Sequence, residues 1–344
     1  MDAIFRIPKW PAALLLAILF LSACSEQKQD SGIVSFSGMT MGTSFTVKWV
    51  DQNTGRVAAL EDEVHQALLD VNQSMSTYIP DSELSLFNKL PAGGEVDASE
   101  ALFFVLSLAQ DISQKTAGAF DVTVGPLVNL WGFGPDGRVI KAPKDDEILL
   151  LQQRIGFQKL VLDADRKRAS KQAALYVDLS AIAKGYGVDV LAGIMEKNGI
   201  DNYLVEIGGE LRAKGVKPEN QDWKIAIESP LIGERKVQDV LSVSDTGIAT
   251  SGDYRNYFEE NGVRYSHTIN PTTGRPISHQ LASVTVLMPT CAEADGMATA
   301  FMVMGDTVAY DYAVKHNIDA LFIVKSEQGF IEKMTPGFDK RLVN

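Results

Sequence analysis

A carboxylate and a hydroxyl stand four residues apart in the segment Glu293 to Ala300, EADGMATA. On a helix, residues separated by four positions share a face, so Asp295 and Thr299 would project side by side. Their oxygens are hard ligands that suit Mg²⁺, which commonly binds one or two carboxylates together with waters and substrate phosphates. The pattern also fits a helix that Asp295 caps and in which Thr299 only packs. A metal site so poor in protein charge predicts an anionic ligand.

A second segment, Val177 to Gly187 (VDLSAIAKGYG), favours anion binding. It predicts a strand that ends at Asp178 and a helix that begins near Ala183. A helix N-terminus offers unpaired N–H groups and a positive dipole end to a phosphate, and Lys184 adds a positive charge there. The segment matches neither the P-loop nor the dinucleotide-binding pattern. A solvent-exposed lysine at a helix start is the alternative interpretation.

Three further positions have the chemistry of a ligand pocket. The turn GAFDVTVG at 118–125 places Asp121 beside Phe120, where a flat ring can stack, although Phe120 also fits a core role. Tyr78 follows a predicted helix and either fixes the loop or faces a ligand. His267 lies beside a run of turn residues, and the proton equilibrium of histidine suits a general base near neutrality.

The N-terminus predicts export and lipid attachment. Residues 1–23 combine a weakly basic start, an apolar run and small residues, as an export signal does, and the apolar run is too short to span a bilayer. The sequence LSAC at 21–24 resembles a bacterial lipobox, which predicts that Cys24 is lipidated after cleavage. An ordinary cleaved signal is the alternative. Residues 24–34 are then a flexible tether, and 35–344 form the folded domain.

The charge balance excludes one class of partner. The chain has 44 acidic and 32 basic side chains and a net charge of −12. Nonspecific nucleic-acid binding depends on basic surfaces, so no nucleic-acid partner is predicted. If Cys24 is lipidated, Cys291 is the only remaining thiol and an internal disulfide is impossible. Cys291 is interpreted as a small buried residue.

Strand patterns follow one another in the second half of the chain, which favours an α+β fold with a largely antiparallel sheet. Helices are predicted over 57–75, 99–115, 147–155, 183–197, 294–304 and 307–315. Strands are predicted over 43–50, 175–178, 203–207, 223–228, 237–243, 265–269, 283–288 and 320–324. Gly208-Gly209 is predicted to be a hairpin turn.

Six ordered motifs together closely resemble the ApbE-type FAD:protein FMN transferases. The motifs are MGT (41–43), GAFDVTVGP (118–126), VDLSAIAKGYGVD (177–189), ATSGDYRNYF (249–258), SHTINPTTGRP (266–276) and ADGMATA (294–300). The resemblance covers essentially the whole mature chain. It implies an ApbE-like, T-fold-like α+β fold with a mixed, largely antiparallel sheet and packed helices.

The same resemblance implies the ligands of the site. Mg²⁺ would be held by Asp295, Thr299 and the backbone carbonyl of Ala181. The family's usual D-A-x-x-T is D-G-x-x-T here, which keeps both side-chain ligands. FAD would be bound by Met41, Tyr78, Ala119, Phe120, Asp121, Asp178, Lys184 and the main chain of Ile269.

The implied activity is cleavage of the FAD pyrophosphate with transfer of FMN, through its phosphate, to a Ser or Thr hydroxyl of another protein. AMP is the second product, and His267 is expected to remove the proton of the acceptor hydroxyl. The expected acceptors are flavin-carrying subunits of membrane redox complexes, of the sodium-pumping NADH:quinone reductase (Nqr) and Rnf types. A lipid anchor on the periplasmic side of the inner membrane fits such partners, although retention in the outer membrane stays open.

Other activities fit parts of the pattern. FAD hydrolysis to FMN and AMP would use water in place of a protein acceptor, and Tyr78, which matches the ring-stacking position of transferase-like members, favours transfer. A lipoprotein that only binds flavin would need neither magnesium nor His267. A serine hydrolase built on Ser251 and His267 is disfavoured because Thr250-Ser251-Gly252 is not a G-x-S-x-G elbow.

Overall fold

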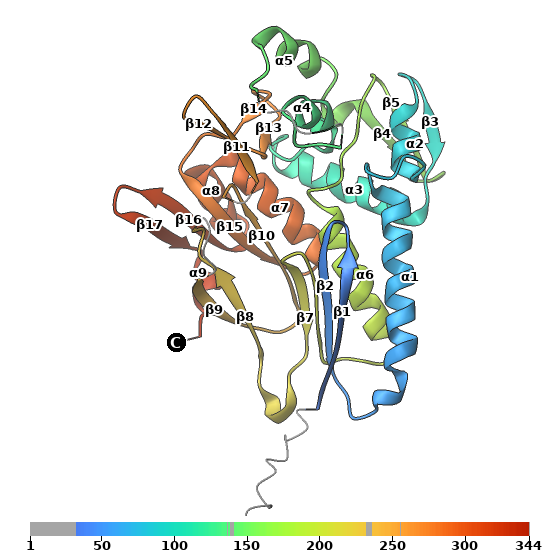
Figure 1. Cartoon of the computed structure of the whole chain (residues 1–344), viewed down its shortest axis with the longest axis vertical. Coiled ribbons are helices and arrows are strands. Elements are labelled where there is room, and N and C mark those ends of the chain that lie inside the picture. The colour runs from blue at the N-terminus through green and yellow to red at the C-terminus, as the bar shows by residue number, and fades with distance from the viewer. Residues whose placement is uncertain (1–31, 136, 138–140, 232–235, 255, 344) are drawn as a thin grey trace, which may run out of the picture.

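The chain folds around an eight-stranded sheet in which every neighbouring pair of strands is antiparallel (Figure 1). The computed structural model describes residues 32–135, 137, 141–231, 236–254 and 256–343. The predicted signal and residues 24–31 of the predicted tether, Cys24 included, lie outside these ranges. In spatial order the strands are β1 (Ile33–Thr40), β2 (Thr43–Val50), β6 (Tyr203–Ile207), β7 (Glu210–Lys214), β10 (Thr246–Gly252), β15 (Leu281–Met288), β16 (Asp319–Ser326) and β17 (Gly329–Met334).

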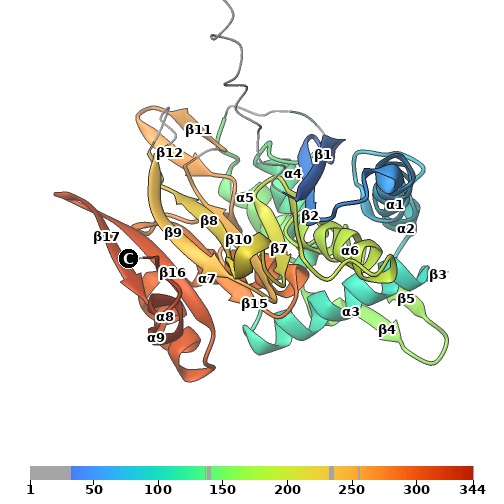
Figure 2. The same cartoon turned by 90° about the horizontal axis from the view of Figure 1, so that it is seen from below.

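Helices cover one face of this sheet, so the prediction of an α+β fold with a largely antiparallel sheet is confirmed (Figure 2). All six predicted helices are present. The α-helices of the described residues are α1 (Val57–Met75), α2 (Glu83–Lys89), α3 (Glu100–Lys115), α4 (Gly125–Leu130), α5 (Asp145–Gln152), α6 (Ala183–Lys197), α7 (Cys291–Met304), α8 (Asp306–Lys315) and α9 (Pro336–Asp339). Single 3₁₀ turns lie at Thr54–Arg56, Val122–Val124, Phe157–Lys159 and Pro218–Asn220.

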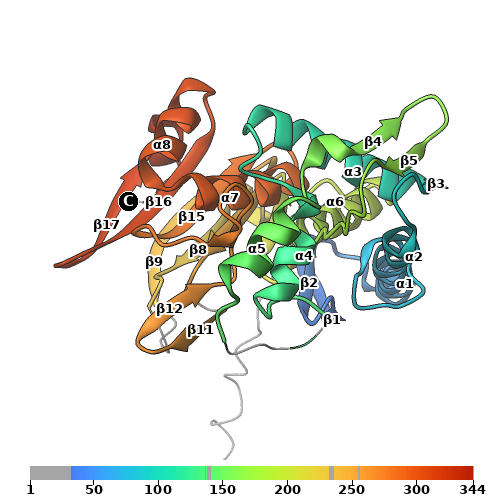
Figure 3. The same ribbon diagram turned by 90° about the horizontal axis from the view of Figure 1, so that it is seen from above.

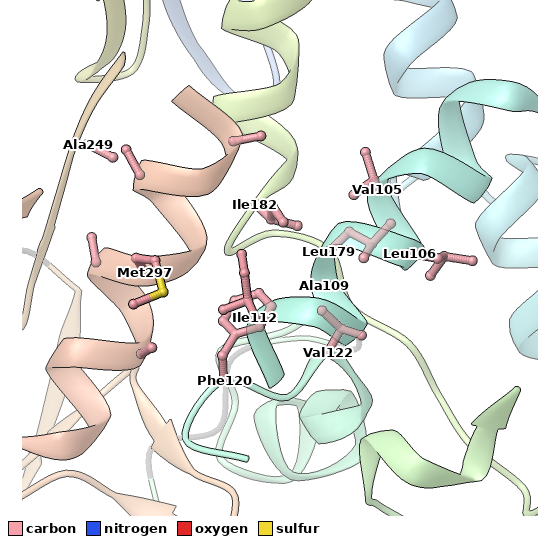
Figure 4. Packing of buried hydrophobic residues seen from close by; sticks show 14 of the residues in the cluster. Val105, Leu106, Ala109, Ile112, Phe120, Val122, Leu179, Ile182, Ala249 and Met297 are labelled. Atoms are coloured by element: carbon pink, nitrogen blue, oxygen red, sulfur yellow. The ribbon is translucent and has the colours of Figure 1, made fainter. Parts of the chain in front are cut away.

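Helix α7 is the most buried helix and carries Asp295 into the core. It begins three residues before the predicted start because Thr290 and Glu293 form a capping box. A Cβ at position 296 would lie 2.6 Å from Cδ1 of Ile112, so Gly296 permits α3 to pack closely on α7. Figure 4 shows Ile112, with Phe120 beside it, pointing into the space beside α7. The glycine that departs from the family pattern therefore leaves the space that the end of the Ile112 side chain occupies.

A separate hairpin covers the opposite face of the sheet (Figures 2 and 3). It consists of β8 (Trp223–Glu228) and β9 (Val237–Val243), both predicted from the sequence. Alternate apolar residues of the hairpin pack on Leu211 of β7 and Ile248 of β10. The C-terminal segment then pairs with the outer edge of β9, since Ser242 N–H donates to Arg341 O at 2.9 Å and Val343 N–H donates to Val240 O at 2.9 Å.

Several short strands lie outside the central sheet, and their bounds differ from one predicted strand. The smaller sheets contain β3 (Glu95–Asp97), β4 (Leu160–Asp163) and β5 (Arg168–Lys171), then β11 (Tyr257–Glu260) with β12 (Val263–Ser266), and β13 (Ile269–Asn270) with β14 (Arg275–Pro276). The predicted strand 265–269 is wrong as a single element, because β12 ends at Ser266 and β13 begins at Ile269. His267 therefore lies in the short break between two hairpins.

The predicted strand 175–178 is also wrong. A side chain replaces the partner strand: Val177 N–H donates to Asn88 Oδ1 at 2.8 Å, and Asn88 Nδ2 donates to Val177 O at 2.8 Å. Asp178 N–H donates to Val122 O at 2.8 Å. The segment is held without belonging to a sheet, because its neighbours are a helix and a 3₁₀ turn.

Four strands of the central sheet are missing from the predicted strand ranges: β1, β7, β10 and β17. Of these, β7 was implied only by the predicted turn at Gly208-Gly209. Strand β1 begins at Ile33, so the last two residues of the segment 24–34 that we expected to be a tether pair with β2. Within the described residues, no helix combines the length and the apolar character that crossing a membrane requires.

Candidate functional site

One cavity of about 1270 Å³ opens at the end of the sheet where the β6–β7 turn lies, between the helical layer and the β8–β9 hairpin. Every described residue that the sequence predicted for the site lines this cavity, although the sequence separates them by up to 258 positions, from Met41 to Thr299. These residues are Met41, Tyr78, Ala119, Phe120, Asp121, Asp178, Ala181, Lys184, His267, Ile269, Asp295 and Thr299. Cys24 lies outside the described residues. Which of the lining residues bind FAD and which bind Mg²⁺ stays a prediction.

Close contact between α6 and α7 builds the charged part of the cavity. The Gly185 N–H, at the start of α6, donates to Oδ2 of Asp295 at 3.0 Å. A Cβ at position 185 would lie 2.5 Å from the carbonyl oxygen of Cys291 and 2.8 Å from Cβ of Asp295. Only glycine lets the two helices approach so closely. The glycine thereby places the α6 N-terminus and Lys184 beside the carboxylate of α7.

The predicted metal ligands have the right donor chemistry for Mg²⁺. Burial raises the pKa of Asp295, while Lys184 and the Gly185 N–H lower it in part. A cation beside Asp295 would further stabilise its charged form. Neither the Thr299 hydroxyl nor the Ala181 carbonyl makes a hydrogen bond within the described part of the chain. A carboxylate, a hydroxyl and a carbonyl are hard oxygens, so this set fits Mg²⁺.

The donor set is poor in negative charge. Among the described residues, no group of three or more His, Cys, Asp or Glu side chains is arranged to hold a metal ion. A metal held by Asp295, Thr299 and Ala181 would keep most of its positive charge for another ligand. The arrangement therefore favours a ligand that brings its own anionic oxygens, such as a pyrophosphate.

Lys184 is half-buried, and its partner is a residue that the sequence analysis missed. Its Nζ lies 2.6 Å from Oε1 of Glu210, the first residue of β7. Glu210 is 3% exposed, and its Oε2 has no hydrogen-bond partner among the described residues. Burial lowers the pKa of Lys184, but the charges of Glu210 and Asp295 outweigh it, so the net shift is upward and the lysine stays cationic. The only sequence signal for Glu210 was its position directly after the predicted Gly208-Gly209 turn.

A second missed residue, Asp189 on α6, fixes the N-terminus of α7. Its two carboxylate oxygens accept from Cys291 N–H at 3.0 Å and from Ala292 N–H at 2.9 Å. Arg212 on β7 donates to the same carboxylate at 3.0 Å. Asp189 therefore provides an N-terminal cap from a neighbouring helix and sets the position of Asp295 one turn along α7. The sequence motif contained Asp189, but nothing in its spacing indicated this contact.

His267 has the proton arrangement of a base. Its Nδ1 lies 3.0 Å from the carbonyl oxygen of Asn256. A carbonyl only accepts, so Nδ1 carries the proton and Nε2 has the free electron pair. Burial lowers the pKa of His267, the Asn256 carbonyl partly opposes this, and the positive charge of Lys184 lowers the pKa further. The imidazole is therefore neutral near pH 7.

Contacts with other residues of the protein fix the side chains of Asp121, Asp178 and Phe120. Asp121 Oδ1 accepts from Thr123 N–H at 2.8 Å and from the Thr123 hydroxyl at 2.6 Å, and Oδ2 accepts from Phe157 N–H at 2.9 Å. Asp178 Oδ1 accepts from Ser180 N–H at 2.9 Å. Phe120 is 2% exposed and packs in the largest hydrophobic core. These contacts shape the cavity wall, and Phe120 leaves no open ring face for a large stacked ligand.

Tyr78 and Met41 line the cavity from two different loops. Tyr78 is 67% exposed, so its ring is available to a ligand. Met41 has φ 49° and Gly42 has φ 72° in the tight turn between β1 and β2. Two consecutive positive φ values are typical of a type I′ hairpin turn, which holds the Met41 side chain near Gly187 of α6.

Comparison with known proteins agrees with this geometry. A family model described as the ApbE family matches residues 41–322. The chain is 45% identical over 331 residues to the FAD:protein FMN transferase of Haemophilus influenzae, with 94% of each chain covered, and 45% identical over 331 residues to that of Vibrio cholerae, with 96% of this chain and 97% of the relative covered. A solved structure of the flavin transferase ApbE from Vibrio cholerae matches with a TM-score of 0.83, covering 90% of this chain and 99% of its own. The chain belongs to the ApbE family.

Proposed function

We propose that this protein is a Mg²⁺-dependent FAD:protein FMN transferase. Its curated relatives carry the name FAD:protein FMN transferase, so the chain is an enzyme of the transferase class. The proposal rests on the composition of the cavity lining. A neutral histidine, a half-buried cationic lysine and a hard-oxygen donor set all line the same space.

The charged part of the cavity would hold the pyrophosphate of FAD. Lys184 and the N-terminus of α6 would bind its oxygens, because both offer positive charge at a fixed position. Asp295, Thr299 and the carbonyl of Ala181 would hold Mg²⁺, which when bound supplies charge neutralisation of the pyrophosphate oxygens. Glu210 keeps the Lys184 ammonium in place, so the positive charge is preorganised before the reaction begins.

Transfer is an in-line displacement at the FMN phosphorus. His267 Nε2 takes the proton of an acceptor Ser or Thr hydroxyl while the hydroxyl oxygen bonds to that phosphorus. The bond from the phosphorus to the bridging oxygen breaks, and AMP leaves with the bridging oxygen. The products are one phosphoester-linked FMN on the acceptor and one AMP, so atoms and charges balance.

FAD hydrolysis to FMN and AMP is the second candidate. It would use the same residues with water in place of the hydroxyl, so the geometry of the charged part is compatible with both reactions. The exposure of Tyr78 favours transfer, because its ring is available to hold the flavin while an acceptor enters. A flavin-binding protein without chemistry is disfavoured, since such a protein has no use for a neutral base at His267.

The acceptors and the location are part of the proposal. We expect the acceptors to be flavin-carrying subunits of Nqr-type or Rnf-type membrane complexes, and Cys24 to anchor the enzyme on the periplasmic side of the inner membrane. The net charge of −12 also disfavours a nucleic-acid partner. Mass spectrometry of membrane proteins from cells with and without the enzyme tests this: the expected subunits should lose their FMN when the enzyme is absent.

The activity is tested with purified protein, FAD, Mg²⁺ and the soluble domain of an Nqr-type acceptor subunit. The acceptor mass should rise by one FMN minus one water, with one AMP released for each modified acceptor. Free FMN and AMP with an unmodified acceptor would favour hydrolysis. No AMP at any Mg²⁺ concentration would leave only flavin binding.

A further inference from the structure

The cavity has a second wall that none of the predicted FAD or metal ligands occupies. This wall consists of β8 residues Ile225 to Glu228, β10 residues Thr250 to Gly252, and Asn256 next to His267. The whole cavity, at about 1270 Å³, exceeds the roughly 300–1,000 Å³ of pockets that hold one drug-sized ligand. A transferase that modifies proteins must also bind a polypeptide. The second wall is the part of the cavity that the predicted FAD and metal ligands leave free for this polypeptide.

The orientation of the β8 backbone follows from its neighbours. Ser242 N–H and Val240 O pair with the C-terminal segment, so the even-numbered residues of β9 face away from β8. The odd-numbered residues of β9 therefore face β8, and Leu241 stands opposite Ile225 in the ladder. Ile225 thus directs its N–H and C=O toward β9. The next residue, Ala226, directs its N–H and C=O to the other side, because these groups alternate along a strand.

That other side of β8 is a free edge. The β8–β9 sheet has two strands only, and no described residue makes a hydrogen bond with the backbone of Lys224 or Ala226. Ala226 is solvent-exposed and lines the cavity, whereas Lys224 lies outside it. Ile225 and Ile227 anchor the strand on the sheet beneath, so the edge is rigid.

We propose that the free edge of β8 binds the acceptor protein, which adds an extended, hydroxyl-bearing segment as a third strand beside β8. Main-chain hydrogen bonds from Ala226 would hold the segment without demanding one particular sequence. The same cavity continues along β10 to Asn256 and His267, so a segment paired with β8 can place its Ser or Thr next to the base. This inference rests on the proposed transfer of FMN to a protein.

The edge also explains a difference between the two strands of the hairpin. The outer edge of β9 is covered by Arg341 to Val343, which removes it as a pairing site. The edge of β8 has no partner among the described residues at Lys224 and Ala226, and of these two Ala226 borders the cavity. Natural proteins cover or charge an edge that has no partner, and an open edge beside an active site is a template for strand addition.

A proline substitution tests the edge directly. Ala226→Pro removes the outward N–H and leaves the bonds to β9 in place, because that N–H is not part of the ladder. With the soluble domain of an Nqr-type acceptor as the probe, we expect the KM for the acceptor to rise at least tenfold. FAD binding, measured by flavin fluorescence, should stay unchanged.

The matched control is Phe330→Pro on β17, an edge strand of the central sheet. Thr335 N–H pairs with Ala320 O of β16, so the odd-numbered residues of β17 face β16 and the N–H of Phe330 faces outward. Phe330 does not line the cavity. This variant should transfer FMN with the wild-type KM for the acceptor, and an equal loss in both variants would overturn the proposal.

Amide hydrogen exchange of the wild-type protein supplies a test that does not depend on a variant folding. The acceptor should slow exchange at Ala226, and FAD alone should not. Protection of Ala226 by FAD alone would make the second wall part of the nucleotide site. If the wild-type enzyme transfers no FMN at all, the proposed function fails; if it transfers FMN but Ala226 is neither protected nor sensitive to proline, only the docking proposal fails.

Discussion

The two walls of the cavity are built in opposite ways. The α6–α7 wall is buried, its groups come from helices held together by Gly185 and Asp189, and its charges are fixed by side-chain pairs. The β8 wall is exposed and offers backbone groups at an open edge. Fixed charges suit a ligand whose shape never changes, such as a pyrophosphate. Backbone groups suit partners whose sequences vary. The difference indicates one wall for FAD and the other for the acceptor.

Breaking the charged wall should have the largest effect. Asp295→Ala removes the only carboxylate of the predicted metal site, so we expect FMN transfer to fall by about 10³-fold or more at ordinary Mg²⁺ concentrations. Quantifying FMN-acceptor by intact mass checks this. Glu293→Ala on the same helix is the control: it removes the capping box and lowers the free energy of unfolding by about 1 kcal/mol, but transfer should persist. Full activity of Asp295→Ala would remove this residue as a metal ligand.

Removing the base should be the next largest effect. His267→Gln should lower the transfer rate by about 10²–10⁴-fold without changing FAD binding. In the wild type, burial lowers the pKa of His267 below the ordinary value of 6.5, so kcat/KM should fall only below that pH, as the imidazole becomes protonated. The variant should lack this acid limb. His65→Gln, an exposed histidine on α1, should leave the profile unchanged; an acid limb that persists in His267→Gln would assign the base elsewhere.

Disturbing the Lys184–Glu210 pair separates binding from turnover within the charged wall. Glu210→Gln keeps the volume but releases the lysine, so kcat should fall by about 10–100-fold while FAD affinity stays equal or rises, because a negative charge near the pyrophosphate is lost. Adding Glu210→Gln to Lys184→Met should cost little more than Lys184→Met alone, since interacting residues are not additive. Additive losses would show that Glu210 acts independently of Lys184.

The smallest effect is expected for Tyr78, an exposed residue of the cavity lining. Tyr78 is 67% exposed, so Tyr78→Ala should raise the Kd for FAD only a few-fold, in line with the roughly 0.5–1.5 kcal/mol of one aromatic pair. Tyr78→Phe keeps the ring and should behave as the wild type. Flavin fluorescence titration measures both. A loss as large as that of Asp295→Ala would mean that Tyr78 belongs to the catalytic charge network.

The sequence predicted the site better than it predicted the sheet. The i, i+4 spacing of Asp295 and Thr299 and the helix start at Ala183 are local patterns, and both elements are present. Glu210 and Asp189 were missed because their contacts join β7 to α6 and α6 to α7, and no local spacing encodes a long-range pair. The predicted strand 175–178 was wrong because Asn88, almost ninety positions away, satisfies the backbone that a strand partner would have satisfied.

The missed strands have a similar cause. The sequence of strand β1 lacks a strong alternation of apolar residues. Pairing with the edge of β2 stabilises this strand. Strand β10 follows a tight turn and contains two glycines, so its composition resembles a loop. Gly247 in β10 is required where the strand passes the start of α7, since a Cβ there would lie 2.4 Å from Cys291 N. Packing against α7, and not local propensity, makes this segment a strand.

FMN transfer in water enriched in ¹⁸O tests most directly whether the acceptor hydroxyl attacks the FMN phosphorus. Attack by the acceptor hydroxyl on the FMN phosphorus leaves the bridging oxygen on AMP, so AMP and the FMN-acceptor should both contain no ¹⁸O and should form in equal amounts. Label in AMP would mean that water attacks the adenylate phosphorus, and unlabelled AMP without FMN-acceptor would mean that the acceptor never reaches His267. Either result would contradict a cavity in which one wall holds the pyrophosphate and the other holds the acceptor.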